Sequence, residues 1–141
     1  MNRRREALKQ ICRRFGITAL YSFGSRAEHV RDWIEEPQAQ LPPGPSDIDI
    51  GVKGIPGENW SITEKVELSG ALEELFACEK VDIVFLAEAD PFLAAEIIRG
   101  ERLFARDERG ADEYDLYVLR RAGDLAPLER ARMAIVLGES T

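Results

Sequence analysis

The sequence has little of several features that would point to particular classes of protein. It holds two cysteines, Cys12 and Cys78, and a single histidine, His29, with no CxxC pair. Neither a zinc finger nor a disulfide-stapled secreted domain is therefore indicated, and we expect two reduced, mostly buried thiols in a cytoplasmic protein. No apolar run is long enough to cross a membrane, and the basic start at 3–5 leads into charged residues instead of a signal peptide's apolar stretch.

Positive charge is also scarce. The chain carries 19 Lys and Arg residues against 26 Asp and Glu, a formal net charge of -7. A protein that holds duplex nucleic acid by a broad basic surface has the opposite balance, so no direct duplex binding is expected. A nucleotide bound through metal ions remains possible, because metal ions need carboxylates. The length of 141 residues, with 45% hydrophobic and 32% charged residues, fits one soluble domain over 1–141.

The most informative stretch present is SDIDIGV, which begins at Ser46. Apolar residues alternate with small or acidic ones, which predicts a strand with Ile48 and Ile50 facing the core. Asp47 and Asp49 would then share the other face, roughly 6–7 Å apart at the backbone. Two carboxylates placed side by side either stay in water or hold a cation between them.

The remaining pattern predicts an α/β (α+β) protein with a small mixed sheet flanked by helices. Helical spacing, a capping box at Ser61 and Glu64, and an Asp90–Pro91 start carry the helix predictions. We expect helices over 3–15, 61–77 and 91–99, C-terminal helices near 110–121 and 125–137, strands over 17–23, 46–52 and 80–86, a short edge strand over 101–106, and a proline-rich loop insert over 32–45.

A third acid lies in the strand expected over 80–86. Asp82 interrupts an apolar run, and an unpaired buried carboxylate there would cost several kcal/mol. If this strand neighbours the Asp47 and Asp49 strand in register, the three carboxylates form one cluster. Hard oxygen ligands of this kind suit Mg²⁺ or Mn²⁺, which keep water and substrate phosphates as their other ligands. A solvated edge residue is the alternative for Asp82.

A Gly24–Ser25 turn separates the first strand from a short helix. Glycine lets the backbone approach a ligand, and amides at a helix N-terminus together with the Ser25 hydroxyl can hold triphosphate oxygens. Arg26 could add a charge-assisted contact, and Ser46 lies beside the acids, so both join the nucleotide-binding candidates. On its own, such a turn is often only the start of a helix.

The three motifs together resemble those of the nucleotidyltransferase superfamily of DNA polymerase β. The segments are Phe23–Ala27, Ser46–Ile50 and Val81–Val84, and the stretch 98–104 followed by helices is also similar. The resemblance is strongest to the small minimal nucleotidyltransferases, often antitoxins paired with HEPN-domain toxins. It implies the polymerase β-like fold over most of the chain.

The resemblance also implies an activity and its residues. Asp47, Asp49 and Asp82 would be catalytic and bind Mg²⁺ or Mn²⁺, and Gly24 and Ser25 would bind the nucleoside triphosphate. The reaction would move a nucleoside monophosphate, AMP from ATP, to a hydroxyl such as a tyrosine of a partner HEPN toxin. Because the sequence shows no other obvious general base than these carboxylates, Asp82 is the expected proton acceptor.

Two features depart from the family pattern. The residues between Ser25 and Asp47 form a longer interval than relatives usually have, and Glu28–His29 stands where a second glycine is usual. Loops tolerate insertions, so the expected fold is unaffected. A catalytically degenerate antitoxin that neutralises a partner by docking is the alternative function. A small-molecule nucleotidyltransferase is disfavoured, because the residues after Arg106 leave little room for a substrate domain.

Several other residues have an ordinary interpretation. Trp33 and Trp60 are expected in loops, where they could stack on a base or pack on the core. Tyr114 and Tyr117, at i and i+3, are expected to pack, and the acidic run 107–115 is expected to be a solvated helix face. The histidine is expected at the surface.

Overall fold

The computed structural model describes residues 2–41, 47–55, 57 and 59–138. The helices are α1 (Arg3–Arg14), α2 (Ala27–Glu35), α3 (Ile62–Phe76), α4 (Pro91–Ile98) and α5 (Glu108–Val136), with a 3₁₀ turn η1 (Leu86–Glu88). The strands are β1 (Ile17–Phe23), β2 (Ile48–Gly54), β3 (Val81–Phe85) and β4 (Glu101–Ala105). No helix within the described ranges is long and apolar enough to span a bilayer.

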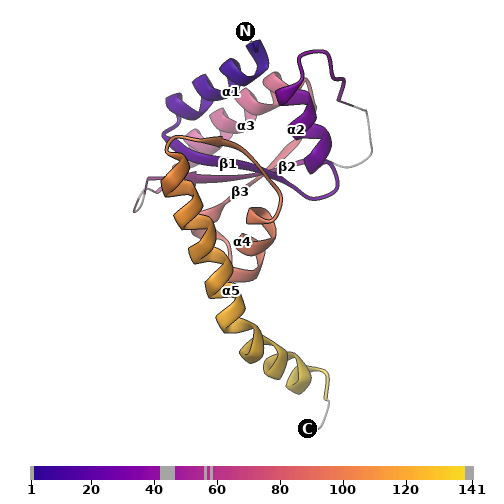
Figure 1. Cartoon of the computed structure of the whole chain (residues 1–141), viewed down its shortest axis with the longest axis vertical. Coiled ribbons are helices and arrows are strands. Elements are labelled where there is room, and N and C mark those ends of the chain that lie inside the picture. Colours follow the sequence, from indigo (N-terminus) through magenta and orange to yellow (C-terminus); the bar gives the residue numbers. More distant parts are fainter. Residues whose placement is uncertain (1, 42–46, 56, 58, 139–141) are drawn as a thin grey trace.

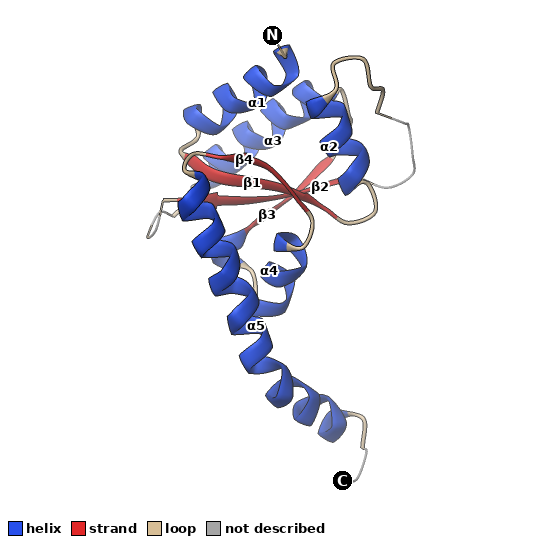
Figure 2. Ribbon diagram, viewed as in Figure 1, coloured by secondary structure: helices blue, strands red, loops and turns tan. Residues whose placement is uncertain are grey.

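The four strands form one mixed sheet in the order β3-β2-β1-β4. β1 runs antiparallel to both β2 and β4, whereas β2 and β3 are parallel. Helices α1, α2 and α3 cover one face of this sheet, and α4 and α5 lie on the other (Figures 1 and 2). The mixed sheet flanked by helices is the fold that the sequence predicts.

Each face of the sheet has its own hydrophobic core. Leu20, Ile48 and Ile50 pack with α1, α2 and α3, and Tyr21 packs on the other face with α4 and α5. The predicted alternation along β2 is therefore confirmed. Gly51 lies on the α4 face, where an added Cβ would stand 2.4 Å from the Ile97 Cγ2 atom, so glycine lets α4 pack closely on the sheet.

The helix starts follow the predicted capping. The Ser61 hydroxyl accepts from the Glu64 amide, and the Glu64 carboxylate accepts from the Ser61 amide, which completes the capping box at α3. At α4, the Asp90 carboxylate accepts from two backbone amides, and Pro91 occupies the first helical position. These local signals need no tertiary information, which is why the sequence locates both helix starts within a residue.

The prediction of two separate C-terminal helices is wrong, because α5 is one helix that runs through the expected gap at 122–124 and also contains Pro127. A proline lacks the amide hydrogen and crowds the carbonyl four residues earlier, which bends a helix without always ending it. Val118 and Ala122, buried against α4, hold the preceding turns in place. The ribbon of α5 changes direction in its C-terminal part (Figure 1).

The loop prediction over 32–45 begins too early, because α2 includes its first residues. Trp33 therefore lies on a helix, with its ring centroid 5.5 Å from that of Phe76 in the core. Beyond α2, the chain to residue 41 is irregular. The Arg4 guanidinium donates to the carbonyls of Trp33 and Ala39, both at 2.8 Å, and so ties this segment to α1.

The other aromatic residues divide between packing and exposure. Trp60 precedes α3, and its ring centroid lies 5.1 Å from that of Phe85, so it is also a packing residue. Tyr114 is half-buried against the α4–α5 core, as predicted. Tyr117 is 57% exposed, so the packing prediction is wrong there.

Candidate active site

The three predicted carboxylates gather where β2 and β3 begin. Asp49 and Asp82 are direct Cα partners across the parallel strands, and Asp47 immediately precedes β2. The two strands are thus neighbours in register, which is the condition that the sequence analysis set for bringing the acids together. Because the neighbouring residues Ile48 and Ile50 are buried against α1–α3, Asp49 faces the opposite side of the sheet, toward α4.

The electrostatics reflect this crowding of negative charge. Burial raises the pKa of Asp49 above its usual range, and the charges of Asp82, Asp47 and Glu96 raise it further. Glu96, which belongs to α4, was not singled out by the sequence. A carboxylate whose negative form is disfavoured gains from a cation nearby.

A cation of the chain itself lies at the cluster. The Lys80 ammonium is 3.5 Å from the Asp47 Oδ2 atom and 3.6 Å from the Asp82 Oδ1 atom. The two carboxylates, Asp82 first and then Asp47, raise the pKa of Lys80. The sequence reasoning missed this residue, although Lys80 and Asp82 are spaced two apart, as residues on one face of a strand are.

The Gly24 turn lies directly against the acids. Phe23, the last residue of β1, is the Cα partner of Asp49, and the chain then turns at Gly24 with a φ of 78°. An added Cβ at Gly24 would be 2.6 Å from the Asp49 Oδ2 atom. The positive φ therefore favours glycine here, and the close approach means that a side chain at this position would push the Asp49 carboxylate aside.

The turn also opens onto a cavity of about 460 Å³ on the α4 side. On one side the cavity is lined by Gly24 and Ser25 of the turn and by His29 of α2. On the other side it is lined by Glu96 of α4, by Arg99 at the C-cap of α4 and by Glu101 at the start of β4. His29 and Ser25 are exposed.

Ser25 does not cap the helix that follows. The N-cap of α2 is Arg26, which is half-buried and makes no side-chain capping bond. The interpretation of the Gly24–Ser25 turn as an ordinary helix cap therefore lacks its usual hydrogen bond. Ser46, the remaining nucleotide-binding candidate, lies outside the described residues.

The donor set can be tested for fit to a divalent ion. As the side chains stand, no group of three or more His, Cys, Asp or Glu residues in the described part of the chain is gathered closely enough to hold a metal. The oxygens of Asp47, Asp49 and Asp82 are nevertheless the hard donors that Mg²⁺ and Mn²⁺ prefer. The Lys80 ammonium already places a positive charge between Asp47 and Asp82. The donor set therefore fits a divalent ion once the Lys80 side chain moves aside.

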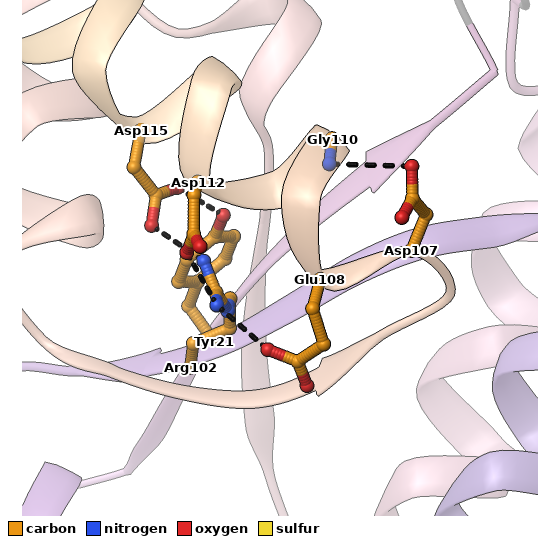
Figure 3. A network of polar contacts seen from close by, with 7 residues as sticks. All are labelled: Tyr21, Arg102, Asp107, Glu108, Gly110, Asp112 and Asp115. Atoms are coloured by element: carbon orange, nitrogen blue, oxygen red, sulfur yellow. Dashed lines mark hydrogen bonds and ion pairs between the residues drawn. The ribbon is translucent and has the colours of Figure 1, made fainter.

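A polar network joins β1, β4 and α5 (Figure 3). The buried Tyr21 hydroxyl donates to Asp115 at 2.5 Å, and the Arg102 guanidinium donates to Asp115 at 2.9 Å. Arg102 also reaches Asp112 at 2.8 Å and Glu108 at 3.1 Å. The prediction that the run 107–115 is a solvated helix face holds for Glu108 and Asp112, whose side chains are 81% and 67% exposed, but it is wrong for Asp115, which is 21% exposed and links α5 to β1 and β4.

Comparison with solved structures relates this fold to known proteins. A structure described as a toxin-antitoxin with AMP-PNP matches with a TM-score of 0.70 at 18% identity, over 94% of this chain and 98% of that one. The MNT antitoxin in complex with tri-AMPylated Shewanella oneidensis HEPN toxin gives 0.66 at 17% identity, over 95% and 96%. A putative minimal nucleotidyltransferase gives 0.51 at 28% identity, over 70% and 86%. At these identities the likeness shows the polymerase β-like fold.

Sequence comparison gives the family. No curated protein sequence is significantly similar to the chain. The family described as Polymerase beta, Nucleotidyltransferase matches residues 6–109, which include the Gly24 turn, the three carboxylates and the whole sheet. The chain therefore belongs to the polymerase beta nucleotidyltransferase family.

Proposed function

We propose that the chain transfers AMP from ATP, or another nucleoside monophosphate from its triphosphate, to a hydroxyl of a partner protein. The observation that carries this proposal is the pairing of Asp49 with Asp82 across β2 and β3, with the Gly24 turn against Asp49. Membership of a nucleotidyltransferase family supports the reaction class. The expected acceptor is a tyrosine of a HEPN toxin, since antitoxins of similar fold are found in complexes with such toxins.

In this proposal Asp47, Asp49 and Asp82 hold Mg²⁺ or Mn²⁺. A bound metal would supply charge neutralisation at the leaving pyrophosphate and activation of the attacking hydroxyl. Burial and, after it, the neighbouring carboxylates raise the pKa of Asp49, and the charge of a bound metal would favour its ionised form.

Phosphate binding and proton transfer would be carried out by residues of the chain itself. Backbone amides of the Gly24–Ser25 turn and the Ser25 hydroxyl donate to phosphate oxygens, and Arg26 and Ser46 are further candidates for these contacts. The acceptor oxygen attacks the α-phosphorus, the bond from that phosphorus to the bridging oxygen breaks, and pyrophosphate leaves. Asp82 accepts the hydroxyl proton. Its side chain is 47% exposed and belongs to the edge strand β3, which a macromolecular acceptor can reach.

A docking module without chemistry is the second candidate. The far end of α5 exposes large apolar side chains, with Leu128 at 69% and Ile135 at 79%. Exposed apolar surface of this kind is typical of an interaction site. Such a surface would serve a partner under either function, so only a chemical assay separates the two.

The test uses ATP labelled separately at the α- and γ-phosphates. The chain is incubated with Mg²⁺ and a partner that copurifies with it, identified by mass spectrometry. Nucleotidyl transfer puts the α-label on the partner and leaves the γ-label in pyrophosphate. Transfer of the γ-label would make the chain a kinase, and neutralisation of the partner without either label would support docking alone.

A further inference from the structure

Lys80 lies at the carboxylate cluster, and the proposed chemistry assigns it no role. It lies immediately before β3, and its ammonium is shared between Asp47 and Asp82 at 3.5 and 3.6 Å. Neither distance is that of a short, directional hydrogen bond, and the side chain is 67% exposed. The ammonium therefore acts through its charge and is free to leave the carboxylates.

We propose that Lys80 is a built-in counter-ion that makes this site select a metal–nucleotide complex over a free divalent ion. The inference rests on the proposed function, because it takes Asp47 and Asp82 as metal ligands. It adds a determinant of specificity to that site: which form of the cation the carboxylates accept.

The charges explain the selection. Three carboxylates alone would attract any divalent ion. A positive charge held between Asp47 and Asp82 weakens that attraction in two ways. A free divalent ion must displace the ammonium from its two partners, and it is then repelled by an ammonium that remains nearby on a short tether. An ion that arrives with a triphosphate brings net negative charge, which the displaced ammonium of Lys80 attracts.

The position of Lys80 suits this exchange. Since the ammonium is mostly exposed, its displacement costs little in side-chain packing. Asp47 and Asp82 also keep a counter-ion when no nucleotide is present.

The experiment compares Lys80→Met with wild type in Mn²⁺ binding, followed by electron paramagnetic resonance of the free ion. Mn²⁺ is titrated alone and then as its complex with AMP-PNP. In water, one unit charge at about 8 Å from a divalent ion, a distance open to the displaced ammonium on its tether, corresponds to about a fivefold change in affinity. We expect Lys80→Met to bind free Mn²⁺ about fivefold more tightly and the Mn²⁺–AMP-PNP complex no more tightly, or more weakly. Lys80→Arg should keep the wild-type preference.

Lys65→Met is the matched control. The Lys65 ammonium lies 2.8 Å from the Glu88 carboxylate, and this ion pair is outside the carboxylate cluster. Lys65→Met therefore also removes one paired lysine charge. It should leave both affinities unchanged. Equal affinities in Lys80→Met and wild type, or a loss of both affinities in Lys80→Met, would overturn the counter-ion role. If wild type bound neither Mn²⁺ nor its nucleotide complex, the proposed function itself would fail, and the counter-ion role with it.

Discussion

Replacing Gly24 by alanine is expected to damage the site far more than the fold. Gly24 has a φ of 78°, a conformation that costs an alanine about 1–2 kcal/mol. In a chain of this length, that cost corresponds to a fall of roughly 3–8 °C in Tm. The new Cβ would also stand 2.6 Å from the Asp49 Oδ2 atom, so the carboxylate must turn away. Turning one short side chain adds little to the cost in stability but moves a proposed metal ligand.

Gly57→Ala provides the control for this variant. Gly57 has a similar φ of 83°, and an added Cβ there meets nothing within 4 Å. The two variants should therefore show similar losses of Tm without ligand. A ligand at 100 times its Kd stabilises a protein by about 2.7 kcal/mol, so saturating Mg-ATP should raise the Tm of wild type and Gly57→Ala by several degrees. Gly24→Ala should lose most of that rise.

The assay is a thermal melt with and without Mg-ATP, with EDTA as a further control. A full Mg-ATP rise in Gly24→Ala would refute the reasoning, because the turn would then tolerate a displaced Asp49. Loss of the rise in Gly57→Ala as well would also refute it, because backbone strain alone would then account for the effect.

Three further results are expected. Tyr21→Phe removes one hydrogen bond to the charged Asp115 and should lower the free energy of unfolding by about 1–2 kcal/mol in urea; an unchanged midpoint would contradict the network. Burial raises the pKa of the Cys12 thiol to about 12, so only Cys78 should react with a thiol reagent at pH 8 in the folded protein, and reaction of both would contradict this burial. Replacing 42–45 by a Gly/Ser linker should preserve the melt but change partner binding or transfer, and identical behaviour would make the segment a neutral insertion.

The elements that the sequence predicted well are those with local signals. The first strand coincides with β1, and Ser61 and Asp90 locate their helix starts, because caps depend on neighbouring residues only. The sequence predicted that Asp49 and Asp82 lie together only on the condition that their strands are neighbours in register. The register that fixes it comes from the packing of the whole sheet.

The misjudged features depend on distant contacts. The predicted break between two C-terminal helices fell at 122–124, where Gly123 disfavours a helix, and the packing of Val118 and Ala122 on α4 favours a continuous helix there. The link from Tyr21 to Asp115 joins residues 94 apart in the chain, so no local pattern indicates it. Glu96 approaches the acids only once α4 has folded back on the sheet, whereas the two-residue spacing of Lys80 and Asp82 was a signal available in the sequence.

The pH dependence of stability gives an independent check on the crowded carboxylates. The pKa of Asp49 is raised in the folded protein, so its ionised form destabilises the fold at neutral pH. Protonation removes this penalty as the pH falls through the folded pKa. Asp49→Asn without metal should therefore melt at or above the wild-type temperature at pH 7, and the gap should close toward acid pH. A variant that melts well below wild type at pH 7 would contradict the crowding.

The most direct measurement of the central claim is the rate at which Asp49→Asn transfers the α-label of ATP to the partner. The substitution keeps the size of the side chain and removes one metal-binding charge. A metal contributes several kcal/mol to such a transition state, so the rate should fall by about a thousandfold. Asp124→Asn, which removes an exposed acid on α5, should transfer at the wild-type rate. A folded Asp49→Asn that labels the partner as fast as wild type would contradict the assignment of this cluster as the catalytic site.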